Sequence, residues 1–385
     1  MAAAGIAQTG IAARGARDAT FSISGPDELA MLGPAWSQIA YDSVGTNVFF
    51  HQEFALPVIE SFGEGGINVA LVQSSSGALR ALTLFRRTRF GRVAPAVRLC
   101  SHKYAPFGEP LVAGGDIEGT LASLVEGLTP GGSGLSLVLP DVPVSGPIAE
   151  AVRAIAAYDT RPLVLLNEHR RAMLTRAAAA DLQGALPRAK RKEIARQLRR
   201  LGDLGPVAFV SDTDAHHVRA RFEEFLALEA AGWKGRHGTA LASTTATAAF
   251  SRAAVSNLAE TGKVRIDSLR VGTHPVAILV SFVGGSAAYT WKIAYDEAYA
   301  RFSPGVQLML AAPEKLFSDP AVMLIDSCAT AGHPMIDGLW PERRGIATFV
   351  LGPPGGGTLF KVGLAAARAE LVARANVRQL RDRLG

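Results

Sequence analysis

Segments with a strand pattern and segments with a helix pattern alternate along the chain, and this alternation favours an α/β fold. In the second half, two apolar runs on either side of a turn at residues 272–275 predict a hairpin over 264–284. A strand over 287–295, a helix that begins near Ser303 and a buried strand over 322–326 follow it. The predicted order is therefore hairpin, strand, helix, strand.

The first half of the chain has the same order of elements. A hairpin that turns at residues 74–77 comes first, and a strand, a helix and a second strand follow up to residue 139. Asp141 comes after that last strand as Asp326 comes after the later one, an offset of 326 minus 141, or 185 positions. Few residue identities accompany this order. We interpret it as a degenerate duplication, and two unrelated α/β segments of similar order are the alternative.

A change of composition near residue 176 predicts a domain boundary, because an Ala-rich stretch passes there into a strongly basic helix. Residues 1–18 carry their basic residues after the apolar ones, which is the reverse of the order in a signal peptide. We therefore expect a disordered leader (1–18), an N-terminal domain (19–176) and a C-terminal domain (177–385).

The composition excludes several classes of protein. With 385 residues, 48% hydrophobic and 19% charged, the chain is long and apolar enough for ordinary globular cores. Two cysteines, Cys100 and Cys328, without a Cys-x-x-Cys motif favour neither a disulfide framework nor a metal site, so we expect no metal and a reducing, cytoplasmic location. The longest apolar block, residues 275–283, is far shorter than the roughly 20 residues of a membrane span. A net charge of +6 favours an anionic partner, such as a phosphate ligand, a nucleic acid or an acidic membrane surface.

One segment predicts an anion site. An aromatic strand leads through Arg301 into Ser303, Pro304 and Gly305, with Ser303 at an N-cap and Pro304 at the first helical position. The free amides at the turn before Val306 and the positive end of the helix dipole suit a pyrophosphate, and glycine lets a ligand approach the backbone. An ordinary helix start after a surface loop is the alternative.

The strand order with a helix N-terminus that faces a phosphate resembles the acyl-CoA site of the GNAT acyltransferase superfamily. Glu229 with Gly-Trp-Lys-Gly at 232–235, the Trp-Lys-x-x-Tyr-Asp run at 291–296 and the Ser-Pro-Gly turn resemble the CelD-like (BioF2-like) acetyltransferase family, which is related to the Fem-type aminoacyltransferases. The resemblance covers about residues 188–351. One departure is the phosphate loop, because residues 301–305 read Arg-Phe-Ser-Pro-Gly where ordinary GNAT enzymes have Gln/Arg-x-x-Gly-x-Gly/Ala.

The resemblance implies tandem GNAT-like domains with mixed sheets flanked by helices, the first of them degenerate. The second domain would transfer an acyl group from acyl-CoA, as acetyl-CoA, to an amine of a small molecule or glycan in polysaccharide or envelope synthesis. Such enzymes work largely by positioning the reactants. Asp326 is the first candidate for the base, with Tyr295 or Asp296 as alternatives, and a tyrosine also suits protonation of the departing thiolate. A structural role for Asp326 is the equal alternative.

Basic and aromatic residues near this segment are candidates for substrate binding. Residues 232–238 predict a loop between two helices that covers the cleft, and a tryptophan that fills a core gap among solvated charges is the alternative. Lys292 points either into the cleft or to the opposite face, and strict strand alternation puts Trp291 and Ile293 together on the other face. The candidates are Trp233, Lys234, Arg236, Trp291 and Lys292.

The basic helix supports a second class of function. Fem-type relatives carry a basic helix at the corresponding place and use aminoacyl-tRNA as the donor, so tRNA is an alternative partner, although motifs of dedicated RNA-binding modules are missing. A non-catalytic scaffold protein is a third hypothesis, and a solvated helix face is the plain alternative. The basic residues are Arg188, Lys190, Arg191, Lys192, Arg196, Arg199 and Arg200.

Overall fold

The computed structural model of the chain describes residues 19–62 and 66–384, and the predicted leader, residues 1–18, lies outside them. The described residues form two compact units, each built from separate stretches of sequence. Unit 1 comprises the described residues of Met1–Phe50, Glu64–His169 and Gly345–Gly385, and unit 2 those of His51–Gly63 and Arg170–Arg344.

Unit 1 is built on a mixed sheet. Its strands are β1 (Ala19–Ser24), β2 (Asn68–Ser74), β3 (Leu79–Phe90), β4 (Ala94–Leu99), β5 (Leu111–Val112), β6 (Ser136–Pro143), the first part of β7 (Leu163–Thr175) and most of β13 (Glu342–Leu351). Within it the order β1-β2-β3-β4-β6-β13 is antiparallel at every step except β4 to β6, which are parallel. β5 pairs with β3 off this path.

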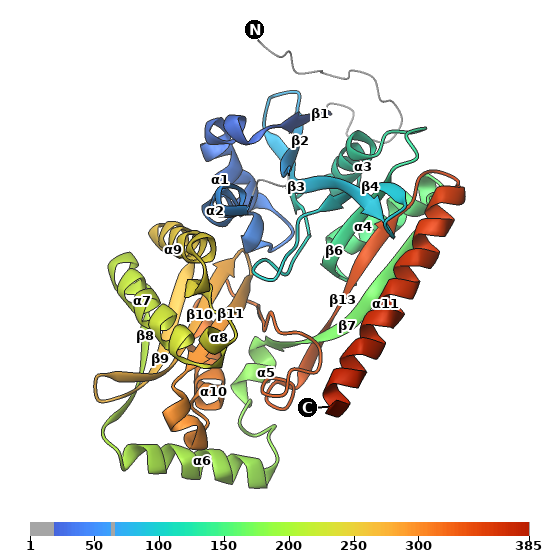
Figure 1. Cartoon of the computed structure of the whole chain (residues 1–385). Coiled ribbons are helices and arrows are strands. Elements are labelled where there is room, and N and C mark those ends of the chain that lie inside the picture. The colour runs from blue at the N-terminus through green and yellow to red at the C-terminus, as the bar shows by residue number, and fades with distance from the viewer. Residues whose placement is uncertain (1–18, 63–65, 385) are drawn as a thin grey trace. The chain divides into compact units, whose positions relative to one another are not determined.

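The helices of unit 1 cover both faces of this sheet (Figure 1). On β4, Val97 and Leu99 pack into the core that includes helices α3 and α4, whereas Ala94 and Ala96 pack under Phe360 of helix α11. Alternate strand residues point to opposite faces, so α3 and α4 lie on one face and α11 on the other. The helices are α1 (Gly33–Asp42), α3 (Ile117–Leu128), α4 (Pro147–Tyr158) and α11 (Thr358–Leu384), with 3₁₀ turns η1 (Pro26–Leu32) and η2 (Val48–Phe50).

Unit 2 has a second mixed sheet. Its strands are β8 (Val207–Asp212), β9 (Val264–Val271), β10 (His274–Gly284), β11 (Ala287–Tyr295), β12 (Leu324–Asp326) and the end of β7. The order is β8-β9-β10-β11-β12-β7, and only β11 and β12 are parallel.

Helix α10 packs on one face of this sheet through Leu308, Met309 and Ala312, and helices α7, α9 and α2 lie on the other (Figure 1). Phe54 of α2 and Phe250 of α9 meet edge to face in an aromatic cluster, with ring centroids 5.3 Å apart. The helices of unit 2 are α2 (Gln52–Phe62), α5 (Arg176–Ala180), α6 (Arg188–Gly202), α7 (Ala215–Ala231), α8 (Trp233–Arg236), α9 (Thr245–Glu260) and α10 (Pro304–Leu316), with 3₁₀ turns η4 (Leu241–Ser243) and η5 (Glu297–Phe302).

The predicted elements are present with small shifts at their ends, but the two units differ from the continuous segments 19–176 and 177–385. Strand β13 hydrogen-bonds to β6, so the end of the chain belongs to unit 1. Helix α2 packs on α9, so this early helix belongs to unit 2. Both assignments depend on contacts between segments far apart in sequence, which local patterns do not reveal.

Each unit repeats one order of elements. The series β2-β3-β4-α3-β6 in unit 1 has the same sequence of hairpin, strand, helix and parallel strand as β9-β10-β11-α10-β12 in unit 2. The predicted α/β class is therefore confirmed, with a mixed sheet flanked by helices in each unit. No helix in the described residues is both long and apolar enough to cross a membrane.

Candidate functional site

Strand β12 is much shorter than β11, and all three of its residues pair with the first part of β11. They pair only from Ala287↔Leu324 to Tyr289↔Asp326, and β11 continues to Tyr295 without a β12 residue opposite it. A cavity of about 350 Å³ lies beside this second half of β11. Its lining residues are Leu228, Glu229, Gly232, Trp233, Lys234, Ile293, Ala294, Tyr295, Glu297, Gly305, His333, Pro334 and Met335.

The N-terminus of α10 opens onto this cavity. Ser303, in the left-handed region with φ 50°, precedes Pro304, and its hydroxyl makes no capping hydrogen bond. The amides of Gly305 and Val306 belong to the first helical turn, so neither has an intrahelical acceptor. A Cβ at Gly305 would lie 3.5 Å from Met335 Sδ and 3.6 Å from Ile293 Cδ1, both ordinary contact distances. The predicted anion-binding turn is thus uncapped by its own serine and borders a cavity.

A β-bulge decides which side chains of β11 face the cavity. Val280 of β10 pairs with Lys292 and the next residue, Ser281, pairs with Thr290, so Trp291 is an extra residue on β11. Ile293 packs on the α10 side and lines the cavity, whereas Trp291 packs against Phe282 on the α9 side, with ring centroids 4.8 Å apart. The expectation that strict alternation puts Trp291 and Ile293 on one face is therefore wrong.

Trp291 and Lys292 have different surroundings. Trp291 is 6% exposed inside the aromatic cluster and does not line the cavity described above. Lys292 is half-buried, and its Nζ lies 5.9 Å from the Trp291 ring centroid. Substrate binding by these two residues stays a prediction.

The Gly-Trp-Lys-Gly motif forms one helical turn, α8, where a loop was expected. The buried Glu229 carboxylate accepts hydrogen bonds from Lys234 Nζ at 2.7 Å and from the Leu241 amide at 2.8 Å. Lys234 Nζ also donates to the Ile293 carbonyl at 3.1 Å, which ties this turn to β11. A Cβ at Gly235 would overlap the Ala230 carbonyl oxygen, so only glycine lets the chain fold back on α7.

Trp233 and Arg236 are held by a common acid. Glu297 Oε1 accepts the Trp233 amide hydrogen at 2.7 Å, and Arg236 forms an ion pair with the same carboxylate at 2.8 Å. These contacts lower the pKa of Glu297, chiefly through the hydrogen bond from Arg236. The Trp233 side chain, about half exposed, lines the cavity, but Arg236 does not.

The acid–base candidates lie in three different places. Tyr295 lines the cavity. Asp296 accepts a hydrogen bond from the Ala298 amide and lies 2.8 Å from His274 Nε2. Asp326 is fully buried and does not line this cavity; it lies 3.6 Å from Arg171 and 3.7 Å from Arg344.

The surroundings of Asp326 favour a structural contribution. Its Oδ1 accepts the Cys328 amide hydrogen at 2.8 Å, and Thr290 donates to the Ser327 carbonyl, which fastens this turn to β11. Burial, and then the Asp326 charge, raise the pKa of the Cys328 thiol well above its usual value. A catalytic role of Asp326 stays a prediction.

Arg301 is exposed, and its guanidinium lies over the Phe302 ring at 4.7 Å, away from the residues that line the cavity. Sequence reasoning missed Pro334 and Met335, which line the cavity beside His333. They lie in a turn-rich stretch without regular periodicity, so no local signal singles them out. Among the described residues, no group of three or more His, Cys, Asp or Glu side chains could hold a metal ion.

Comparison with known proteins identifies the class of this domain. The family model described as an acetyltransferase (GNAT) domain matches residues 188–329. No curated protein matches the chain in sequence. The residues that match this GNAT acetyltransferase domain model all lie in unit 2.

Solved structures share the fold across both units. FemX is similar with a TM-score of 0.53 and 9% identity, over 81% of this chain and 95% of its own. The C-terminal domain of a putative lysylphosphatidylglycerol synthetase from Agrobacterium fabrum has a TM-score of 0.54 and 11% identity, over 89% and 96%. A conserved protein of unknown function from Bacteroides thetaiotaomicron VPI-5482 has a TM-score of 0.54 and 13% identity, over 86% and 99%. At such low identity these similarities concern the fold.

Proposed function

We propose that unit 2 transfers an acyl group from acyl-CoA to an amine. The observation that carries this proposal is the cavity at the N-terminus of α10, beside the part of β11 that has no β12 residue opposite it. The amides of Gly305 and Val306 would bind the pyrophosphate, since free N–H groups and the helix dipole both favour an anion. The pantetheine arm would lie along Ile293 and Tyr295.

The chemistry requires little more than this arrangement. An amine nitrogen attacks the thioester carbonyl carbon, a new C–N bond forms, and the C–S bond then breaks with release of CoA thiolate. Tyr295, the acid–base candidate that lines the cavity, is suited to protonate the thiolate. Asp296 and Asp326 remain the proposed acceptors of the amine proton, with Asp326 the weaker because two arginines already pair with it. Positioning of the reactants alone lowers the activation barrier by about 7–11 kcal/mol in well-oriented reactions.

The acceptor we propose is an amine of a small molecule or glycan in polysaccharide or envelope synthesis. This follows from the resemblance of the Glu229, Gly-Trp-Lys-Gly and Ser-Pro-Gly segments to the CelD-like family. FemX and the lysylphosphatidylglycerol synthetase domain have the same fold, and this agrees with a transferase in that setting.

An aminoacyl-tRNA donor is the second candidate, and the surface of α6 favours it. Six of its seven basic side chains are exposed: Arg188, Arg191, Lys192, Arg196, Arg199 and Arg200. The opposite side of the helix is anchored, because Gln307 donates to the Ile194 carbonyl at 2.8 Å. Titration of tRNA at two salt concentrations tests this donor; absence of binding at low salt rules it out.

Calorimetric titration with CoA and acetyl-CoA tests the main proposal, with Gly305→Asp as the diagnostic variant. A Cβ is tolerated at Gly305, and an acid in the first turn is favourable for the helix, so the variant should fold. Its carboxylate would repel the pyrophosphate and weaken binding by at least about tenfold. Gly305→Asn is the matched control of equal size without the charge.

Two results would contradict the proposal: no saturable binding of either compound by the unaltered chain, or equal affinity of the Asp and Asn variants. Release of free thiol from acetyl-CoA in the presence of amines would exclude the non-catalytic scaffold hypothesis.

A further inference from the structure

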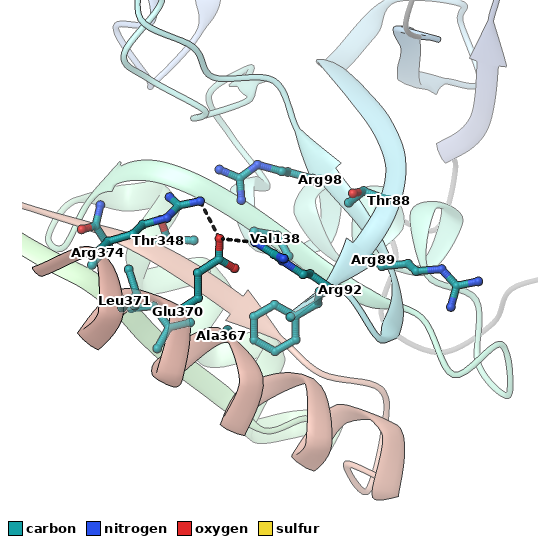
Figure 2. Close-up of a pocket in the computed structure, with 14 residues that line it drawn as sticks. Thr88, Arg89, Arg92, Arg98, Val138, Thr348, Ala367, Glu370, Leu371 and Arg374 are labelled. Atoms are coloured by element: carbon teal, nitrogen blue, oxygen red, sulfur yellow. Dashed lines mark hydrogen bonds and ion pairs between the residues drawn. The ribbon is translucent and has the colours of Figure 1, made fainter. Parts of the chain in front are cut away.

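A second cavity, of about 590 Å³, lies within unit 1 between helix α11 and the sheet (Figure 2). The helix touches the sheet closely near its start, where a Cβ at Gly91 would overlap the Gly363 carbonyl oxygen. Further along, α11 contributes residues at spacings of three and four to the cavity wall, so one face of the helix lines it. These residues are Ala367, Glu370, Leu371 and Arg374.

The wall of this cavity carries an excess of positive charge. Arg92 and Arg374 both contact Glu370, the one carboxylate among the described residues that line it, at 3.4 and 2.6 Å (Figure 2). Arg98 of β4 also lines it, and no carboxylate among the described residues lies within 4 Å of its guanidinium. Arg89 points away from the others, donating to the Val93 carbonyl (Figure 2).

Arg98 and Arg374 act on each other as like charges. Desolvation by neighbouring atoms, and then the Arg374 charge, lower the pKa of the exposed Arg98, while the Asp141 charge opposes them. Among the described residues, three guanidinium groups and one carboxylate face this cavity, so its wall has a net positive charge that favours an anion.

The rest of the wall narrows the class of ligand. Thr88, Asn167 and Thr348 add neutral polar groups, and Val138, Leu166 and Leu371 add apolar surface. Phe90 stacks on Phe360 with ring centroids 5.9 Å apart and is only 7% exposed, so it offers little surface to a nucleobase. The walls thus suit a compact anionic group attached to an apolar or small body better than a nucleotide base.

We propose that this cavity binds the phosphate or diphosphate group of a phosphorylated small molecule or of a lipid headgroup. Guanidinium groups match phosphate oxygens through paired hydrogen bonds, and the volume lies in the range of small-molecule sites. Exposed Val93 and Val372 directly follow lining residues in the sequence, so an anionic bilayer is one of the two sources to test.

The experiment uses the full chain carrying Gly305→Asp, so that pyrophosphate bound at α10 does not enter the result. Pyrophosphate is titrated by calorimetry, and vesicles of phosphatidylglycerol or of phosphatidylcholine alone are tested by co-sedimentation. Arg98→Gln and Arg374→Gln remove charges from the cavity. Arg368→Gln removes the same charge from an exposed position of the same helix and is the matched control.

We expect saturable binding. The affinity should fall at least tenfold with Arg98→Gln and change less than twofold with Arg368→Gln. Binding of pyrophosphate identifies a free phosphorylated compound as the source, and binding of phosphatidylglycerol vesicles alone identifies a lipid headgroup. No binding of either probe, or equal loss with Arg98→Gln and Arg368→Gln, overturns the proposal. Arg374→Gln gives an independent test if Arg98→Gln does not fold.

Discussion

Replacement of Lys234 by methionine tests whether the Gly-Trp-Lys-Gly motif is structural. The change leaves the Glu229 carboxylate, whose side chain is 2% exposed, with a single N–H donor from Leu241, and leaves the Ile293 carbonyl without its donor. Removing one partner of a buried ion pair costs about 3–5 kcal/mol. Lys234 keeps 23% of its side-chain surface exposed, so we expect the lower end, about 3 kcal/mol.

The measurement is the thermal midpoint of unfolding. A loss of about 3 kcal/mol corresponds to roughly 6–12 °C for a cooperative unit of 150–250 residues. The control is the double variant Glu229→Gln with Lys234→Met, which removes the unpaired buried charge and should lose less than the sum of the two single changes. A midpoint within 2 °C of the unaltered chain, together with lost turnover of acetyl-CoA, would show that Lys234 acts on a substrate instead.

Two further changes in unit 2 give opposite effects on stability. Gly235→Ala should strongly lower the urea concentration at the midpoint of unfolding, because its Cβ would overlap the Ala230 carbonyl oxygen. Gly202→Ala is the control, because there is open space around Gly202 and its midpoint should not fall. Equal midpoints for the two variants would contradict the steric role of Gly235. Burial raises the pKa of Asp267 to about 6 in the folded chain. Between the pKa of Asp267 in the unfolded chain and pH 6, the folded chain therefore binds more protons than the unfolded chain, and its stability falls as the pH rises. Asp267→Asn, which retains an acceptor for Ser211, should therefore raise the thermal midpoint at pH 8 by the equivalent of up to about 3 kcal/mol and not near pH 4, and an identical change at both pH values would refute the cause.

Local sequence patterns were enough to predict the helices and strands, because residues close together in the sequence determine where these elements form. The strand pattern and the turn at residues 272–275 predict the hairpin that β9 and β10 form. The Ser-Pro-Gly start predicts α10, which begins at Pro304. These signals depend on residues within a few positions of each other, so a single sequence is enough to detect them.

Features that depend on distant segments could not be predicted in this way. The bulge at Trp291 is a matter of register between β10 and β11, and without the register the alternation of side chains gave the wrong face for Ile293. The assignment of β13 to unit 1 and of α2 to unit 2 depends on contacts with segments far away in the sequence. The charged cavity of unit 1 likewise brings Arg98 together with Arg374, 374 minus 98, or 276 positions later.

The Gly-Trp-Lys-Gly motif was only partly predictable from the sequence. Its residues were recognised as belonging together with Glu229, but a basic, aromatic loop suggested contact with a ligand. A signal for the structural role was present, since an acid near the end of one helix and a lysine five positions later can pair across the turn between them. The structure places this pair at the cavity wall, so one side chain supports the site and borders it.

Comparison of the two helices that follow the third strand of each repeat explains why the proposed coenzyme site belongs to unit 2. In unit 1, Asp116 caps α3 and accepts the Gly119 amide hydrogen at 2.9 Å, so a carboxylate of the chain itself occupies the anion position. Glu118 adds a second acid to that first turn. In unit 2, Ser303 leaves the first amides of α10 uncapped, and no acid lies in the first turn. A pyrophosphate would be repelled at the first helix and attracted at the second, and this difference is what the interpretation of unit 1 as the degenerate copy requires.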